Sequence, residues 1–337
     1  MVKKTLILLI VSAIFYSELI HSEEDGKFSY TTQNFDEDDK SCPGILVQNE
    51  AVNLDNARDQ DTIGWCYAYS ASDLLSFHLG QRISAVSLYD SHLSIEASIK
   101  SQTDIGGAGF LAVEKYLKKN KGFCLEKDLP SSDFKFCADM NYRSFLVMFF
   151  DEIKKQRVND LMKNNRCFSE SVDAAFPQLG PERLKQYLDQ DGTQFLIERI
   201  FDFHCKEHHF QNFKPKFEHS NDLKFSKIEL LKKIHQELDS KRIIEIGYQY
   251  SILNGEKNSL PKAHSSVVMG RRKNKGTGKC EFLIRNSWGK TCIQNEDQDL
   301  NCHKNCDSFG CRPSGHFWVS EDRLSSALSN VTRLTND

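Results

Sequence analysis

The sequence predicts an α+β fold, because helical and strand patterns occupy different parts of the 337-residue chain. Apolar residues at helical spacing fill the runs 66–75 and 111–117 in the first half. After residue 226 one further helical run is followed by β-branched stretches such as 243–248. We therefore expect a helical half at residues 42–137 and a β-rich half at residues 226–337, with a ligand cleft between them.

Residues 138–225 separate the two halves and are expected to form a helical insertion. Apolar residues recur at helical spacing between Phe145 and Ile153, and again between Phe195 and Phe203. Such stripes predict a small helical unit that packs on the rest of the chain. The unit would either limit access to the cleft or simply stabilise the fold, and the sequence leaves both possibilities open.

The N-terminus is predicted to be a signal peptide at residues 1–22. Lys3-Lys4 precedes a short apolar run at 5–16, and a basic start before such a run is typical of secretory signals. The run is too short for a comfortable membrane span. An uncleaved signal anchor is the alternative, and no other membrane contact is expected. The polar residues 23–41 are expected to form an acidic linker.

Cysteine usage agrees with export. The chain has eleven cysteines, and an odd number in an oxidising compartment suggests one reactive thiol among disulfide-bonded partners. The alternative is that several are simply buried thiols. The expected location is therefore extracytoplasmic, whether secreted, periplasmic or in a lysosome-like compartment.

Cys66 is the candidate for the reactive thiol. It follows Gly64-Trp65 and begins an apolar, helix-forming run. A thiol at a helix N-terminus feels the positive end of the helix dipole, which favours the nucleophilic thiolate. Gln60, six positions earlier, is a candidate amide donor for a developing oxyanion.

Two downstream residues complete a possible catalytic set. His264 leads into a β-branched run, and Asn286 follows an apolar strand-like run. A cysteine nucleophile needs a base, and the base needs an orienting partner. Cys66, His264 and Asn286 would supply these three roles in chain order.

Five stretches of the chain resemble the signature blocks of the papain-like cysteine peptidases: 60–70, 263–264, 286–289, 106–107 and 122–130. The resemblance covers residues 42–137 and 226–324 but not the segment between them. It implies a two-subdomain fold with a helical left half, a β-rich right half and the active site in the cleft between them.

The resemblance also implies a role for each site residue. Cys66 would be the nucleophile and His264 its base, and the pair would rest as thiolate and imidazolium. Asn286 would orient the imidazole, and Trp288 would shield that hydrogen bond from water. Gln60 and the backbone N–H of Cys66 would form the oxyanion hole.

The substrate would be held by glycines near the nucleophile. Gly64 and the Gly106-Gly107 edge are expected to contact it, the latter by pairing with its backbone as an added strand. The alternative is that Gly106-Gly107 forms only a turn. Ala108 would lie near the pocket for the residue two positions before the cleaved bond, and Trp288 would line the cleft.

The sequence departs from the family pattern in several places. Ile63 stands where a bridged cysteine is usual, and Trp65 replaces the usual small residue and could narrow the first pocket. Tyr67 replaces the usual Trp, a milder change. His264 lies 198 positions after Cys66 (264 − 66), whereas the family spacing is roughly 130–150. The insertion accounts for the excess.

Two clusters offer thiolate and imidazole ligands for a metal: Cys302, His303, Cys306 and Cys311, and His204, Cys205, His208 and His209. Neither has paired Cys-x-x-Cys spacing, so disulfides and a solvated histidine face are expected instead. We expect no metal and no cofactor. The net charge of −3 and the absence of a basic stripe argue against nucleic acid as a partner.

The sequence thus predicts an exported papain-like cysteine endopeptidase that hydrolyses a peptide or protein substrate through a thioester on Cys66. One alternative is an aminopeptidase or transpeptidase built on the same triad, because only the shape of the cleft separates these activities. Another is a non-catalytic binding protein that kept the fold. The retention of Gln60, Cys66, His264 and Asn286 argues against the latter, and Trp65 is the one feature in its favour.

Overall fold

The computed structural model describes residues 31–33, 42–60, 65–88, 122–131, 135–137, 140–141, 166, 205, 209–210, 212–253, 263–289, 300–307 and 310–335. The expected signal peptide, most of the expected insertion, and the expected substrate-binding residues Gly64, Gly106, Gly107 and Ala108 lie outside these ranges. No helix within them combines the length and the apolar character needed to cross a membrane.

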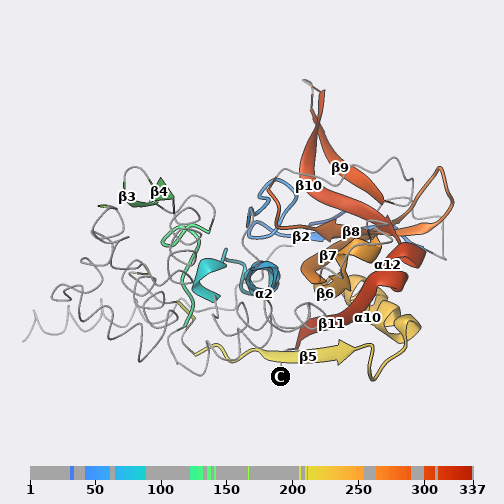
Figure 1. Ribbon diagram of the computed structural model, residues 1–337, viewed down its shortest axis with the longest axis horizontal. Coiled ribbons are helices and arrows are strands. Elements are labelled where there is room, and N and C mark those ends of the chain that lie inside the picture. The colour runs from blue at the N-terminus through green and yellow to red at the C-terminus, as the bar shows by residue number, and fades with distance from the viewer. Residues whose placement is uncertain are drawn as a thin grey trace, which may run out of the picture. The chain divides into compact units, whose positions relative to one another are not determined.

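The α+β fold class predicted from the sequence is confirmed, since helices combine with an antiparallel sheet (Figure 1). The described strands are β1 (Thr31–Gln33), β2 (Ile45–Gln48), β3 (Lys135–Cys137), β4 (Met140–Asn141), β5 (Lys216–Asn221), β6 (Ile244–Gln249), β7 (Ala263–Lys273), β8 (Cys280–Arg285), β9 (Leu300–Asp307), β10 (Gly310–Ser320) and β11 (Leu328–Thr335). The helices are α2 (Cys66–Leu79), the 3₁₀ turn η1 (Val86–Leu88), α10 (Lys227–Asp239), α11 (Tyr250–Leu253) and α12 (Glu321–Ala327).

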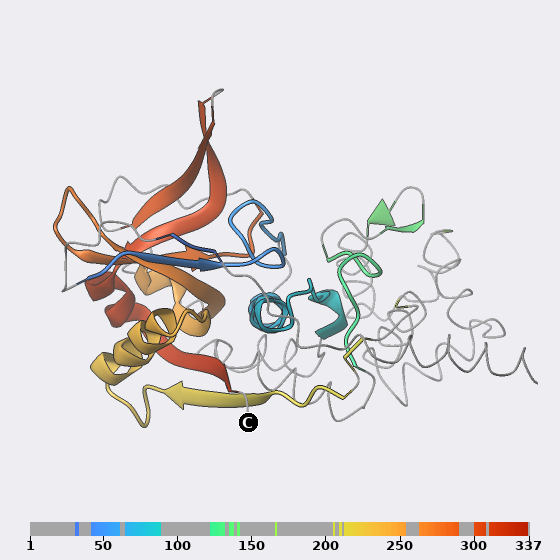
Figure 2. The ribbon, with the colours of Figure 1, turned by 180° about the vertical axis from the view of Figure 1, so that it is seen from behind.

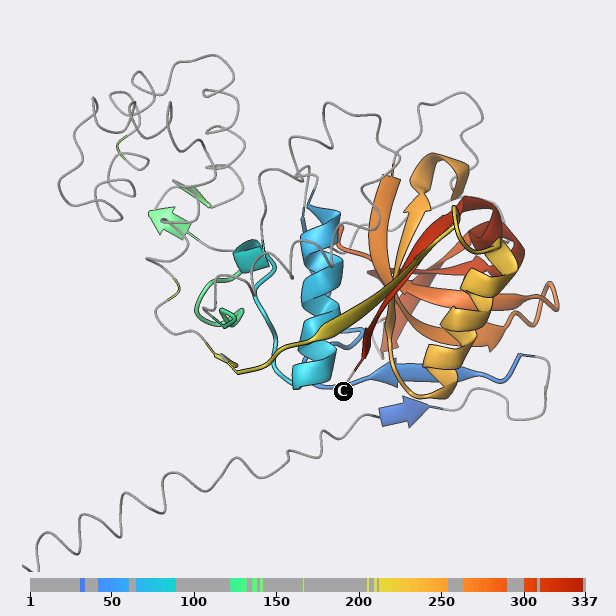
Figure 3. The ribbon, with the colours of Figure 1, turned by 90° about the horizontal axis from the view of Figure 1, so that it is seen from below.

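One nine-stranded sheet organises the described part of the chain, in the order β5-β11-β6-β7-β8-β10-β9, with β2 paired to β7 and β1 to β2. The long strand β7 pairs with β6 over its first residues and with β2 at Gly270 and Arg271. Helix α2 lies against one face of the sheet, and α10 and α12 lie against the other (Figure 3). The nucleophile candidate on α2 and the base candidate on β7 therefore belong to packed neighbours.

Helix α2 is buried on nearly all sides, as an apolar sequence without a polar stripe requires. Only Phe77 and His78 near its end are partly exposed. It begins at Cys66 directly after Trp65, with no side-chain cap on its first N–H groups. Gly80 ends it in the left-handed conformation at φ 65°, which glycine adopts without strain. The backbone N–H groups at the start of the helix therefore lie at Cys66.

Helix α10, unlike α2, has a side-chain cap at its N-terminus. Ser226 caps it through a capping box with Glu229, which satisfies two of the backbone donors at its start. Its buried residues Leu230, Ile234 and Leu238 follow helical spacing and pack on the sheet. This confirms the helical run expected directly after residue 226.

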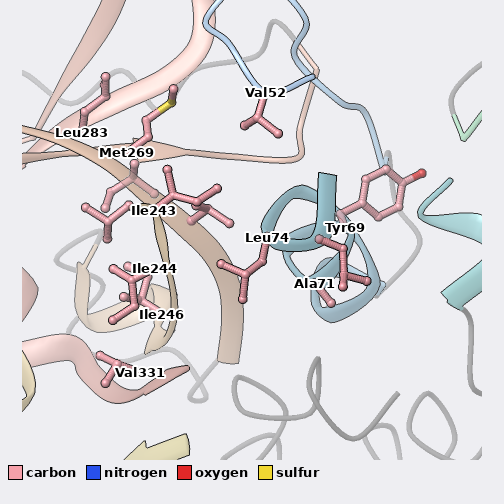
Figure 4. Close-up of a cluster of buried hydrophobic side chains, with 14 of the residues drawn as sticks. Val52, Tyr69, Ala71, Leu74, Ile243, Ile244, Ile246, Met269, Leu283 and Val331 are labelled. Carbon is pink, nitrogen blue, oxygen red and sulfur yellow. The ribbon is translucent and has the colours of Figure 1, made fainter. Parts of the chain in front are cut away.

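The core lies on both faces of the sheet. Figure 4 shows Leu74 extending from α2 toward the sheet, where Met269 and Leu283 also lie. Ile244 and Ile246 of β6 are fully buried with them. Burying such side chains contributes roughly 1.5–3 kcal/mol each, so this packing holds α2 in place.

Three described strands lie in segments that were expected to be a linker or helical: β1, β5 and the short β4, which pairs with β3. Thr31–Gln33 lies within the expected acidic linker but pairs with β2 as β1. Lys216–Asn221 lies within the expected helical insertion but pairs along β11 as β5 (Figure 2). β1 and β5 are edge strands, and each takes its hydrogen bonds from one partner strand. The partner strand therefore decides their conformation, and their own sequence gives little indication of it.

Disulfide bonds tie distant segments together. Cys42 is bonded to Cys280, and Cys124 to Cys205. Among the cysteines whose state the structure describes, Cys66 has a free thiol. The disulfides agree with an extracytoplasmic location.

Candidate active site

Cys66 is the first residue of α2, and only 4% of its surface is exposed. The backbone N–H groups of Tyr67, of Cys66 itself and of Ser265 interact favourably with its ionised sulfur. Two of these groups are the uncapped donors of the helix start, as the sequence predicted. The third comes from β7, next to His264, so the thiol lies where the nucleophile helix meets the strand of the candidate base.

His264 and Asn286 are joined by a hydrogen bond of 2.8 Å between Nε2 and Oδ1. Oδ1 also accepts the backbone N–H of Ser287 at 2.9 Å, which fixes it as the oxygen of the amide. Because an amide oxygen only accepts, Nε2 carries the imidazole proton. Nδ1 is then the unprotonated nitrogen, and a neutral imidazole in this tautomer can act as a base.

Aromatic rings surround the imidazole. The Trp288 ring lies 4.6 Å from it between centroids, and Tyr248 meets it edge-on at 5.5 Å. Tyr250 in turn packs edge-on against Trp288 at 4.9 Å. The shielding role expected for Trp288 therefore has a geometric basis. The sequence did not identify Tyr248 and Tyr250 as site residues, because nothing in their local pattern marks them as such.

Gln60 is anchored beside Asn286. Its backbone N–H donates to the carbonyl of Ser287 at 2.6 Å, and Ser287 Oγ donates to its side-chain Oε1. The acceptor end of the amide is thereby held by Ser287. An oxyanion hole requires the other end of the amide, the N–H₂ donor.

A buried ion network fixes the backbone on both sides of Asn286. Asp73 of α2 accepts from Arg58 Nε at 2.8 Å and from Arg285 Nε at 2.6 Å. Arg58 also pairs with Glu126 at 2.7 Å, and its carbonyl accepts the N–H of Gly289. Charged groups of this kind stay buried only when paired. The network thus holds α2, the segment before it and the residues around Asn286 in one arrangement.

The protonation states differ from the sequence expectation. Burial raises the pKa of the Cys66 thiol to about 11, although neighbouring N–H groups act in the opposite direction. Burial also lowers the pKa of His264 to about 4, although its bond to Asn286 opposes the shift. This buried arrangement therefore favours a thiol and a neutral imidazole at neutral pH, rather than the expected resting ion pair. Desolvation outweighs the helix N-terminus, and only the latter is visible in the sequence.

Each of the two clusters considered as a metal site contains a disulfide-bonded cysteine, Cys205 in one and Cys302 in the other. Neither cysteine can therefore serve as a thiolate ligand. Cys306 and Cys311 lie in paired strands and are opposite each other in the register of β9 and β10. Among the described residues no group of three or more potential ligands could hold a metal ion.

Comparison with known proteins gives structural neighbours only. No protein-family model and no curated protein sequence matches the chain. The solved structures that it resembles are papain-like cysteine peptidases. One is a structure of the mite allergens Blo t 1 and Der p 1, at 13% identity and a TM-score of 0.40, covering 96% of this chain and 77% of that chain.

Two others are SERA5E from Plasmodium falciparum and the bromelain protease from Ananas comosus. SERA5E is 11% identical with a TM-score of 0.40, over 90% of this chain and 96% of its own. Bromelain is 13% identical with a TM-score of 0.38, over 91% and 100%. Likenesses of this size say nothing about activity, which has to be inferred from the site itself.

Proposed function

We propose that this chain is an exported cysteine endopeptidase of the papain-like type. The observation that carries the proposal is the bond between His264 Nε2 and Asn286 Oδ1, which leaves Nδ1 as a base on the strand beside the one described free thiol. The disulfides Cys42–Cys280 and Cys124–Cys205 and the predicted signal peptide support export. The finer assignment as an endopeptidase rests on the sequence resemblance.

The proposed reaction moves one proton and one acyl group in each half. Cys66 Sγ attacks the carbonyl carbon of the scissile peptide, and its proton passes to His264 Nδ1. The imidazolium then gives this proton to the leaving amine, and a thioester forms on Cys66. Water attacks the thioester, with His264 taking its proton and returning it to the sulfur, and the acid leaves.

Asn286 and Trp288 would keep the imidazole in the required tautomer throughout. The oxyanion of each tetrahedral intermediate would be stabilised by the Cys66 backbone N–H and the Gln60 amide. The buried site also explains why the ion pair need not exist at rest. A substrate that displaces water allows proton transfer to accompany attack, so that charge develops mainly in the transition state.

Active-site labelling tests the proposal directly. A peptidyl epoxide should attach to Cys66 and to no other cysteine of the non-reduced protein, as read by peptide mass mapping. Cys66→Ala should abolish labelling, and His264→Ala should slow it strongly because the base is lost. Labelling at other cysteines, or no labelling of a folded protein, would refute the proposed function.

Gln60→Ala tests the oxyanion hole. Loss of one oxyanion donor lowers kcat by on the order of a hundredfold or more, because the interaction is made mainly in the transition state. Gln236→Ala, an exposed glutamine on α10, is the matched control and should leave kcat unchanged. An effect of Gln60→Ala confined to KM would remove Gln60 from the oxyanion hole.

A further inference from the structure

Three oxygen atoms form a closed ring between α2 and the strands that carry the site. Ser70 Oγ lies 2.7 Å from Ser265 Oγ and 2.9 Å from Glu245 Oε1, and Ser265 Oγ lies 2.8 Å from the same Oε1. All three residues are buried. Ser70 follows Cys66 by one helical turn, and Ser265 follows His264 directly. The ring therefore joins the nucleophile helix to the strand of the base.

The ring contains more contacts than two hydroxyls can supply with protons. Each of its three oxygen–oxygen contacts needs one hydrogen, and Ser70 and Ser265 bring one each. Ser70 Oγ also lies 3.1 Å from the carbonyl of Tyr67, which competes for its hydrogen. An ionised Glu245 would leave at least two oxygens facing each other at hydrogen-bond distance without a proton. A protonated Glu245 supplies the missing hydrogen and closes the ring.

The surroundings of Glu245 also favour the neutral acid. The residue is fully buried, and its Oε2 has no hydrogen-bond partner among the described residues. No Lys or Arg within the described ranges forms an ion pair with it. Burial raises the pKa of Glu245 to about 7, although the bonds from Ser265 and Ser70 oppose the shift. A buried charge without a cation is costly, whereas the acid is not.

Few titratable groups face Glu245 from the elements packed around it. Helix α2 brings the Cys66 thiol, whose pKa is raised chiefly by burial and further by a charge on Glu245. Strand β11 places Thr332 opposite Glu245, and Thr332 is bonded to His219 of β5 at 3.1 Å. Strand β7 brings the uncharged Ser265. Burial lowers the pKa of His219, so this imidazole is neutral near pH 7.

We propose that Glu245 is a positioning residue of the cysteine peptidase site, active as the neutral acid and inhibitory once ionised. The proposal rests on the proposed function of Cys66 and His264. As the acid, Glu245 ties α2 to β7 through the two serines and puts no charge near the thiol. As the carboxylate, it leaves one oxygen–oxygen contact of the ring without a hydrogen. Its negative charge also disfavours the Cys66 thiolate. The site should therefore lose reactivity as the pH rises through the ionisation of Glu245.

Glu245→Gln separates the charge from the packing. The Nε2 group of glutamine brings two hydrogens to the ring, so both serines accept from it and one hydroxyl still donates to the other. The variant thus mimics the acid at every pH. With a wild-type pKa of about 7, the acid fraction falls about tenfold between pH 6 and pH 8. The ratio of kcat/KM for Glu245→Gln over wild type should rise about tenfold over this range.

Alkylation of Cys66 by iodoacetamide gives a readout that does not require peptidase activity. Its rate should show the same tenfold change of the ratio, so a chain that hydrolyses no peptide can still confirm the role of Glu245. Glu281→Gln is the matched control, since Glu281 is a buried glutamate of β8 paired with Arg272 at 2.8 Å. This variant should leave the pH profile of alkylation unchanged.

Infrared spectroscopy reads the proton itself and needs no variant to fold. At pH 6 exposed carboxylates are ionised, so a carboxylic acid C=O band in the wild type reports buried acids. The band should disappear as the pH rises above 7, and Glu245→Gln should lack it. Coincident alkylation profiles of wild type and Glu245→Gln, a profile shifted equally by Glu281→Gln, or no acid band at pH 6 would each overturn the proposal.

Discussion

Cys66→Ala is expected to lower kcat/KM for peptide hydrolysis by a factor on the order of 10⁴–10⁶. The sulfur is the only protein atom of the proposed mechanism that bonds to the acyl group, and Cys66 carries a free thiol. His264→Ala should be nearly as damaging, because the two side chains act as one unit. Hydrolysis of a fluorogenic peptide over a range of substrate concentrations measures the loss.

Cys66→Ala and His264→Ala should both keep the fold although they lose activity. Alanine fits the space of Cys66 with the loss of one buried sulfur, so thermal unfolding should shift little. Cys66→Ser keeps the shape of the side chain but replaces the thiol with a far weaker nucleophile, and it should be as inactive as Cys66→Ala. Wild-type turnover by either variant would end the assignment as a cysteine peptidase.

Asp73→Ala is expected to lower the free energy of unfolding by roughly 3–5 kcal/mol. Asp73 accepts from both Arg58 and Arg285, and its removal leaves Arg58 with the carboxylate of Glu126 but takes the carboxylate away from the buried guanidinium of Arg285. Urea denaturation of the wild type and the variant measures the difference. Asp322→Ala removes an exposed ion pair with Lys279 and is the control that should change stability little.

The same variant should damage the site. Arg285 directly precedes Asn286 and also holds the carbonyls of Asn53 and Asn56, so loss of its partner loosens the backbone that orients His264. Burial opposes the ionisation of Asp73, but Arg285 and Arg58 still lower its pKa below 3.8. The stability that Asp73 contributes is thus present above the ordinary pKa of an aspartate and is lost as the pH falls through the lowered pKa. An Asp73→Ala protein as stable as wild type would contradict the role of the network.

The sequence could predict the helix of Cys66 and the strand after His264 because local patterns determine them. The local motifs around His264 and Asn286, their order in the chain and the family resemblance named the two residues together, and the structure joins them by a hydrogen bond. Glu245 was missed because its surroundings come from α2 and β7, which are distant in the chain. No pattern within β6 shows that its carboxyl has two hydroxyls and no cation beside it.

Burial opposes the expected resting ion pair for a related reason. A sequence shows that Cys66 starts a helix, but it does not show how completely the thiol is removed from water. The desolvation that raises its pKa arises from packing between distant segments. The edge strands β1 and β5 were not predicted for the same reason, because their hydrogen-bond partners lie elsewhere in the chain.

The disulfides have a consequence for a chain that is nicked. Cys42–Cys280 spans 238 positions, and Cys124–Cys205 lies within that span. Any single break of the backbone between Cys124 and Cys205 separates the piece bearing Cys66 from the piece bearing His264, yet two covalent bridges still join them. The nicked protein would migrate as one species on a gel without reductant and as two with it. Trimming of the central segment therefore need not release either half of the site.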